Sequence, residues 1–114
     1  MKFSIKKPSI DTEFNVQAYV YNELKKLGFD VHGEVKAQYE GRKVSRFDLV
    51  IFQSDLPVAI IEIKKSPINH KTRWENTRQG RKYFDYGVPV IILYGMVDAK
   101  DFIESKKYTT IISC

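Results

Sequence analysis

Two stretches of this chain, Arg46-Phe-Asp-Leu-Val-Ile-Phe52 and Val58-Ala-Ile-Ile-Glu-Ile-Lys64, decide its fold. Both are rich in the branched and aromatic residues that favour strands, and the turn signal Ser54-Asp-Leu-Pro57 separates them. The second stretch opens with four apolar residues in a row, which is typical of a strand buried on both faces in the middle of a sheet. We therefore expect two adjacent strands, over 44–53 and 58–64, at the centre of the protein.

The segments on either side of this pair predict a mixed α/β domain that covers residues 1–114. The chain of 114 residues fits one domain of ordinary size. A helix between the third and fourth strands implies a parallel crossover, whereas the first three strands follow one another through short turns. In chain order we expect a helix over 13–27, strands over 29–38, 44–53 and 58–64, a helix over 73–86, a strand over 88–94, a short helix ending near 106, and an edge strand over 109–112.

The first and last helices have clear end signals. Asp11 or Thr12 can serve as the N-cap of the first helix, and Gly28 can end it in a left-handed conformation. Asp98 can cap the last helix. On a helical wheel the first helix has one apolar stripe with Glu13 at its centre, where a carboxylate packed against the sheet needs a partner. The stripe consists of Phe14, Val20, Tyr21, Leu24 and Leu27.

The composition excludes several classes of protein. No apolar run approaches the roughly 20 residues that span a bilayer, and the N-terminal segment lacks the apolar stretch of a signal peptide. The single cysteine, Cys114, excludes a disulfide framework and a zinc site built from several cysteines. We expect a protein of the cytoplasm without a membrane partner.

The positive charge is concentrated in one segment. Residues 64–82 contain seven basic residues and one acid, whereas the net charge of the whole chain is +5. A basic patch attracts polyanions, most often nucleic acid, although most runs of charge are only solvated helix faces. The sharp segregation favours the polyanion, and DNA is the expected partner. The candidate DNA-binding residues are Lys65, Lys71, Arg73, Arg78, Arg81 and Lys82.

Three carboxylates and a lysine predict a metal-dependent hydrolase. With a period of two, Glu62 and Lys64 share one face of their strand, and Asp48 on the neighbouring strand can approach Glu62. Two carboxylates that close repel each other unless a cation lies between them. With Glu13 they form a hard oxygen site that suits Mg²⁺, and the lysine can stabilise negative charge or act on a water, as metal-assisted phosphodiester hydrolysis requires. Glu34 could be a fourth carboxylate, but its strand phase favours an exposed position.

The same residues carry a resemblance to a known group of enzymes. Asp48, followed by Glu62-Ile-Lys64 on the next strand, resembles the split motif of the PD-(D/E)XK nuclease superfamily, which has the restriction-endonuclease-like fold. Phe47 stands where the motif's name has proline. More narrowly, Glu13-Phe-Asn-Val-Gln17 on the opening helix and Gln79-Gly-Arg-Lys-Tyr83 are similar to segments of the N-terminal nuclease domain of type I restriction enzyme motor subunits.

The resemblance covers roughly residues 12–97 and implies a Mg²⁺-dependent deoxyribonuclease, in which Mn²⁺ can replace Mg²⁺. It implies metal ligation by Glu13, Asp48, Glu62 and the backbone carbonyl of Ile63. It implies catalytic roles for Asp48, Glu62, Lys64 and Gln79, and a structural role for Tyr83. Cutting both strands usually needs two active sites, so we expect a homodimer or a larger homo-oligomer. No motor segment follows, so we expect a nuclease domain that stands alone, in a phage, a mobile element or a small prokaryotic system.

Three other functions stay open at this point. The chain could be a catalytically inactive, nucleic-acid-binding relative of the same fold, or a compact homing or junction-resolving nuclease. It could also be an assembly module whose basic helix binds an acidic protein. The complete set of acids and lysine favours the enzyme, and a steep dependence of binding on salt would favour nucleic acid over a protein partner.

Overall fold

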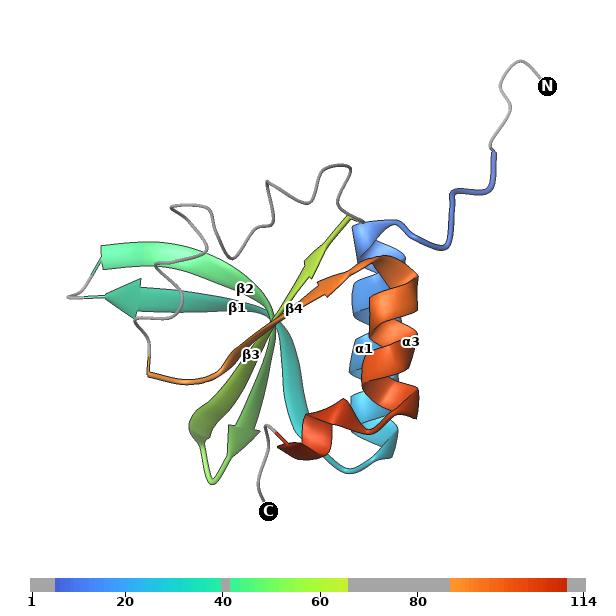
Figure 1. Cartoon of the computed structure of the whole chain (residues 1–114). Coiled ribbons are helices and arrows are strands. Elements are labelled where there is room, and N and C mark those ends of the chain that lie inside the picture. Colours follow the sequence, from blue (N-terminus) through green and yellow to red (C-terminus); the bar gives the residue numbers. More distant parts are fainter. Residues whose placement is uncertain (1–5, 40–41, 66–86, 111–114) are drawn as a thin grey trace.

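The computed structural model of the protein describes residues 6–39, 42–65 and 87–110, and it has the expected mixed α/β architecture (Figure 1). The helix predicted over 73–86 lies outside the described residues. The elements are helix α1 (Glu13–Lys26), strands β1 (Asp30–Tyr39), β2 (Arg42–Gln53), β3 (Leu56–Lys64) and β4 (Val90–Tyr94), helix α3 (Gly95–Glu104) and the short 3₁₀-helix η3 (Lys107–Thr110).

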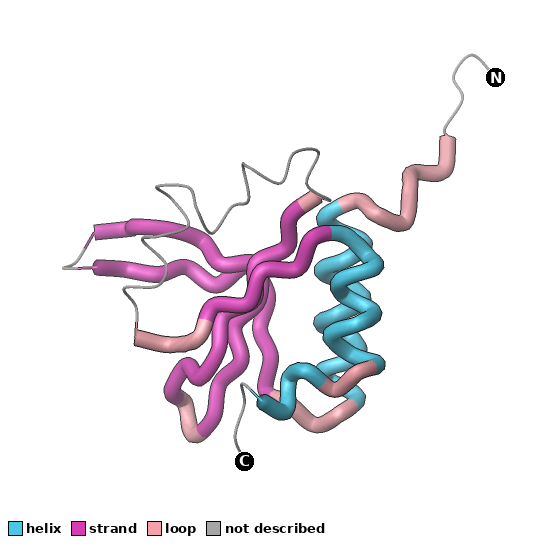
Figure 2. The backbone as a smooth tube through the Cα atoms, viewed as in Figure 1, coloured by secondary structure: helices cyan, strands magenta, loops and turns pink. Residues whose placement is uncertain are grey.

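The described strands form one four-stranded sheet in the order β1-β2-β3-β4 (Figure 2). Strands β1, β2 and β3 are antiparallel neighbours, as the two short turns between them require. Strand β4 pairs with β3 in parallel, with Ile61 opposite Ile91. The predicted meander followed by a parallel crossover is therefore confirmed.

The helices α1 and α3 lie side by side on one face of the sheet (Figures 1 and 2). The main core lies between them and the sheet, where Leu24 packs with Leu49, Ile61 and Phe102. A second apolar cluster covers the opposite face, because alternate residues of a strand point to opposite faces. It contains Phe47, Val50, Ile60 and Tyr94. As predicted, β3 is buried on both faces, and in the described ranges no helix has the length and apolar content needed to cross a bilayer.

The apolar stripe predicted for α1 is wrong at its ends. The buried residues of the helix are Val16, Val20 and Leu24, spaced four apart, whereas Phe14 is 79% exposed and Leu27 is 50% exposed. Phe14 is exposed because it lies on a different face of α1 from the buried row, and Leu27 because it follows the last helical residue. Glu13 is exposed rather than packed at the centre of the contact.

Strand alternation also fails near the middle of the sheet. A strict period of two would place Phe47 with Leu49, but Phe47 packs in the second cluster with Val50. On the neighbouring strand, Glu34 has a φ of +56°, a left-handed conformation that is uncommon for a residue with a side chain. This local reversal accompanies the bend of the β1–β2 pair that Figure 1 shows.

Helix α1 begins and ends as predicted, whereas α3 and the segment after it differ from the prediction. Thr12 caps α1, since its hydroxyl accepts a hydrogen bond from Asn15 N at 3.3 Å, and Gly28 has the left-handed φ of +95°. Helix α3 begins earlier than predicted, at Gly95, and Asp98 reaches back to accept from Tyr94 N at 2.9 Å. The edge strand predicted from residue 109 is wrong for Thr109 and Thr110, which belong to η3.

Candidate active site

The acidic pair Asp48 and Glu62 lies where β2 and β3 separate. The backbone ladder between these strands reaches Leu49 opposite Ile61, and the next position along holds the two acids. At this position the backbone N–H groups donate to the two carboxyl groups instead of to backbone carbonyls. Asp48 N donates to Glu62 Oε1 at 3.1 Å, and Ile63 N donates to Asp48 Oδ2 at 2.7 Å. Each carboxyl is thus tethered to the backbone of the opposite strand, which fixes the two groups against each other.

Burial raises the pKa of both carboxyls, and nearby charges change it further. Glu62 is 3% exposed, and its pKa is raised to about 8. The main cause is burial, and the second is the negative charge of Asp48. Burial also raises the pKa of Asp48, although the hydrogen bond from Ile63 N and the charge of Lys64 lower it in part. The hydrogen bond from Asp48 N and the charge of Lys64 lower the pKa of Glu62 only in part. A cation bound beside the pair would favour the charged form of both carboxyls.

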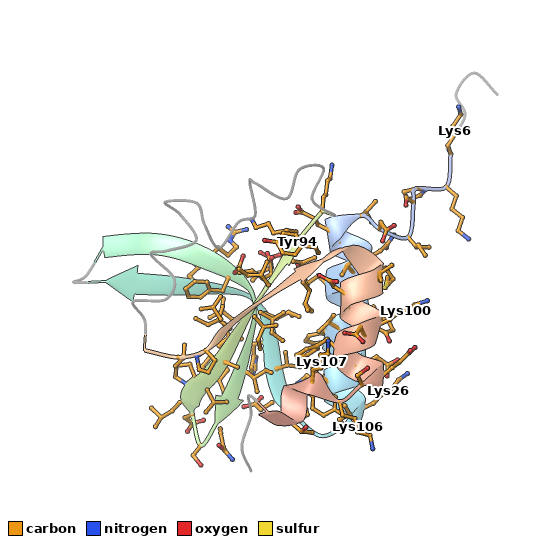
Figure 3. The ribbon with its side chains drawn as sticks, viewed as in Figure 1. Lys6, Lys26, Tyr94, Lys100, Lys106 and Lys107 are labelled. Atoms are coloured by element: carbon orange, nitrogen blue, oxygen red, sulfur yellow. The ribbon has the colours of Figure 1, made fainter. Side chains whose placement is uncertain are left out.

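Lys64 is the last residue of β3 and lies beside this pair. Its charge lowers the pKa of both Asp48 and Glu62, which places the ammonium group within electrostatic reach of both carboxyls. In the parallel ladder Lys64 is opposite Tyr94, the residue labelled at this end of β4 in Figure 3. Lys65 follows as an exposed residue.

Helix α1 approaches the site with its first two turns. The charge of Glu13 contributes to the raised pKa of Asp48, so Glu13 lies within electrostatic range of this acid. One turn later, Gln17 Nε2 donates to the backbone oxygen of Asp48 at 3.1 Å and to Glu34 Oε1 at 3.3 Å. Among the described residues, however, no group of three or more His, Cys, Asp or Glu side chains is close enough to hold a metal ion. The structure brings two of the three predicted carboxylates together and leaves the third nearby.

Sequence reasoning gives no role to Gln17 or Arg46, and it places Glu34 at an exposed position. Gln17 holds the backbone of Asp48, Glu34 contacts Gln17, and Arg46 Nη1 lies 3.7 Å from Glu34 Oε2. The spacing of Gln17 four residues after Glu13 puts both on one helix face, a signal that was available in the sequence. The roles of Glu34 and Arg46 carry no such signal. The prediction that Glu34 is exposed is confirmed, yet its carboxylate still takes part in the local network.

Several predicted site residues lie outside the described residues. They are the catalytic candidate Gln79, the motif residue Tyr83, and the DNA-binding candidates Lys71, Arg73, Arg78, Arg81 and Lys82. Their placement stays a prediction from the sequence.

A mixed sheet with helices on one face, and with an acid pair and a lysine where its two central strands separate, defines a restriction-endonuclease-like domain. The family described as type I restriction enzyme R protein N terminus matches residues 6–100, and the chain belongs to this family. The resemblance based on Asp48, Glu62 and Lys64 is thereby confirmed at the level of the family. No curated protein matches the chain, and no solved structure does.

Proposed function

We propose that this chain is a Mg²⁺-dependent endonuclease that hydrolyses phosphodiester bonds of DNA. The observation that carries the proposal is the tethered pair of Asp48 and Glu62, with Lys64 beside it. An isolated buried carboxyl pair costs stability, because desolvated like charges repel each other. The chain belongs to a family of restriction enzyme domains, and metal-assisted phosphodiester hydrolysis uses a cation at the scissile phosphate. Binding of that cation would explain why the pair is present despite its cost.

The donor set fits magnesium. Mg²⁺ prefers oxygen ligands and is usually held by one or two carboxylates together with waters and substrate phosphates. Asp48 and Glu62 provide two such carboxylates, fixed on neighbouring strands. Glu13 and the backbone carbonyl of Ile63 are the proposed additional ligands, and Mn²⁺ is the expected substitute. When bound, the ion would supply an activated water and neutralise charge that builds up on the phosphate.

The protein residues around the pair have separate roles in this proposal. Lys64 orients the attacking water or stabilises the negative charge of the scissile phosphate. Gln79 is proposed to act on the metal site or on the adjacent nucleotide. The basic residues of 64–82, including Lys65, hold the phosphate backbone and position the duplex without reading its bases.

We further propose that the enzyme acts in the cytoplasm as a homodimer or larger homo-oligomer, since two symmetric sites can cut both strands. An inactive relative that keeps the site only as a scaffold could retain the tethered acids, but it would have no need of Lys64. The specific role, whether in restriction, homing or junction resolution, depends on the DNA structure that the enzyme prefers.

The test is a cleavage assay on supercoiled, linear and branched DNA with Mg²⁺, with Mn²⁺, and with chelator. We expect cleavage that chelator abolishes. Asp48→Ala and Lys64→Ala should each lose at least about a hundredfold in rate. Lys100→Ala, an exposed lysine of α3, is the matched control and should retain the rate. Equal cleavage by wild type and Asp48→Ala would refute the proposal.

A further inference from the structure

The β1–β2 pair extends beyond the four-stranded sheet as a two-stranded arm. The ladder between β2 and β3 covers Leu49 to Gln53, whereas the ladder between β1 and β2 continues to Tyr39 opposite Arg42. Residues 34–39 and 42–48 thus form an antiparallel ribbon, here called the arm, which projects to the left of the body in Figure 1. The arm begins at the acidic pair, because Asp48 belongs to both.

The arm carries two cations directly opposite each other. Lys36 on β1 is the register partner of Arg46 on β2, and both side chains are exposed. Register partners of an antiparallel pair point to the same face, and like charges in that position destabilise the sheet. Glu34, whose Oε2 lies 3.7 Å from Arg46 Nη1, offsets only part of this positive charge. An anion bound across the ribbon would turn the repulsion into attraction.

Arg46 is also held near the acidic pair. It lies two residues before Asp48, a separation of roughly 7 Å along a strand. Glu34, which contacts Arg46 at 3.7 Å, accepts from Gln17, and the same amide of Gln17 donates to the Asp48 backbone. The cationic face of the arm is therefore connected to the candidate active site through a continuous set of contacts.

We propose that the arm is a second duplex-DNA contact, in which Lys36 and Arg46 bind phosphates next to the bond that is cut. A two-stranded β-ribbon fits the major groove of B-form DNA, and guanidinium groups bind phosphate in a bidentate manner. The inference deepens the proposed function, because it supplies a DNA contact outside the basic segment 64–82. It places the duplex across β1, β2 and the acidic pair.

The experiment measures binding of a short fluorescent random-sequence duplex in EDTA over a series of salt concentrations. Without a divalent ion the readout is independent of cleavage, so it stands even if the nuclease proposal fails. We expect Lys36→Ala with Arg46→Ala to weaken binding by roughly tenfold to a hundredfold at about 0.1 M salt. The slope of log affinity against log salt should fall by about two.

Lys26→Ala with Lys100→Ala is the matched control, because it removes the same charge from the helical side of the molecule (Figure 3). It should leave the slope nearly unchanged. The single variant Lys36→Ala leaves the contact between Arg46 and Glu34 intact. It should lower the slope of log affinity against log salt by about one. Glu34→Gln should bind at least as tightly as wild type, since it removes a negative charge.

Two outcomes would overturn the inference. One is an equal loss of affinity in the arm variant and in the helical control, which would indicate a response to net charge alone. The other is an equal loss of DNA affinity in the single variants Glu34→Gln and Arg46→Ala, which would show that Arg46 serves only as the partner of Glu34.

Discussion

At the scale of residues, the site depends on carboxyl groups that replace backbone acceptors. Where β2 and β3 separate, Asp48 N and Ile63 N would otherwise lose their partners in the ladder, and a buried unpaired N–H costs about 1–3 kcal/mol. Glu62 and Asp48 satisfy these donors. The same hydrogen bonds hold the carboxyls in place. The contacts that satisfy the backbone therefore also fix the position of the proposed metal ligands.

The raised pKa of Glu62 predicts how stability depends on pH without metal. Its pKa rises from 4.5 to about 8, so between these values the folded protein holds a proton that the unfolded chain releases. The free energy of unfolding should therefore fall as the pH rises through this window, by on the order of a few kcal/mol. Glu62→Gln keeps an acceptor for Asp48 N without titrating, so its stability should fall much less. Urea unfolding in chelator at about pH 5 and about pH 8 measures both, and parallel pH curves would contradict this account.

Gln17 is predicted to position Asp48 for the proposed reaction. Gln17→Leu removes the donor to the Asp48 backbone and to Glu34, which should cost about 1 kcal/mol in unfolding free energy. Misplacement of the acid should lower the cleavage rate at saturating DNA by roughly tenfold or more, with little change in KM. Asn22→Leu makes a comparable change on the exposed side of α1 and should leave turnover unaltered. A rise in KM alone would instead assign Gln17 to DNA binding.

At the scale of elements, the patterns that were predicted correctly are local ones. Thr12 and Gly28 bound α1, and the apolar run in β3 marks a central strand, because each signal acts within a few residues of itself. The missed features depend on contacts distant in sequence. The start of α3 is an example, since its N-cap residue Tyr94 makes no side-chain cap, and Asp11 Oδ1 instead accepts from Met96 N at 2.8 Å. A local pattern cannot reveal a cap that comes from a segment more than eighty residues earlier in the chain.

This cap gives a prediction for α3. Asp11→Ala leaves Met96 N without its acceptor and removes a negative charge from the start of the helix, so the free energy of unfolding should fall by about 1 kcal/mol. Glu104→Ala, at the exposed end of the same helix, should change it by less than about 0.5 kcal/mol. Urea unfolding compares the two variants. Equal stability of Asp11→Ala and wild type would show that the α1–α3 connection is not needed for the helix.

At the scale of the whole molecule, the sheet order could be predicted from the sequence, whereas the candidate site could be predicted only in part. A strand meander and one parallel crossover leave few topologies, so the order β1-β2-β3-β4 follows from chain connectivity. The pairing of Asp48 with Glu62 follows from strand register. The approach of Glu13 could not be predicted in the same way. It depends on the angle at which α1 crosses the sheet, and the wheel had assigned this residue to the buried face.

A divalent ion that binds between β2 and β3 should stabilise the entire fold. Binding to the folded state alone raises the unfolding free energy by about 2.7 kcal/mol when the ligand is at a hundred times its Kd. The pKa of Glu62 is raised to about 8, and its carboxyl must lose its proton before it can bind the ion, so Mg²⁺ should stabilise the protein more at about pH 8 than at about pH 6. Thermal melts with Mg²⁺ or chelator measure the effect. Asp48→Asn should abolish the shift, whereas Asp101→Asn, an exposed acid of α3, should preserve it. A shift of equal size in Asp48→Asn would place the ion elsewhere and remove the central support for the proposed chemistry.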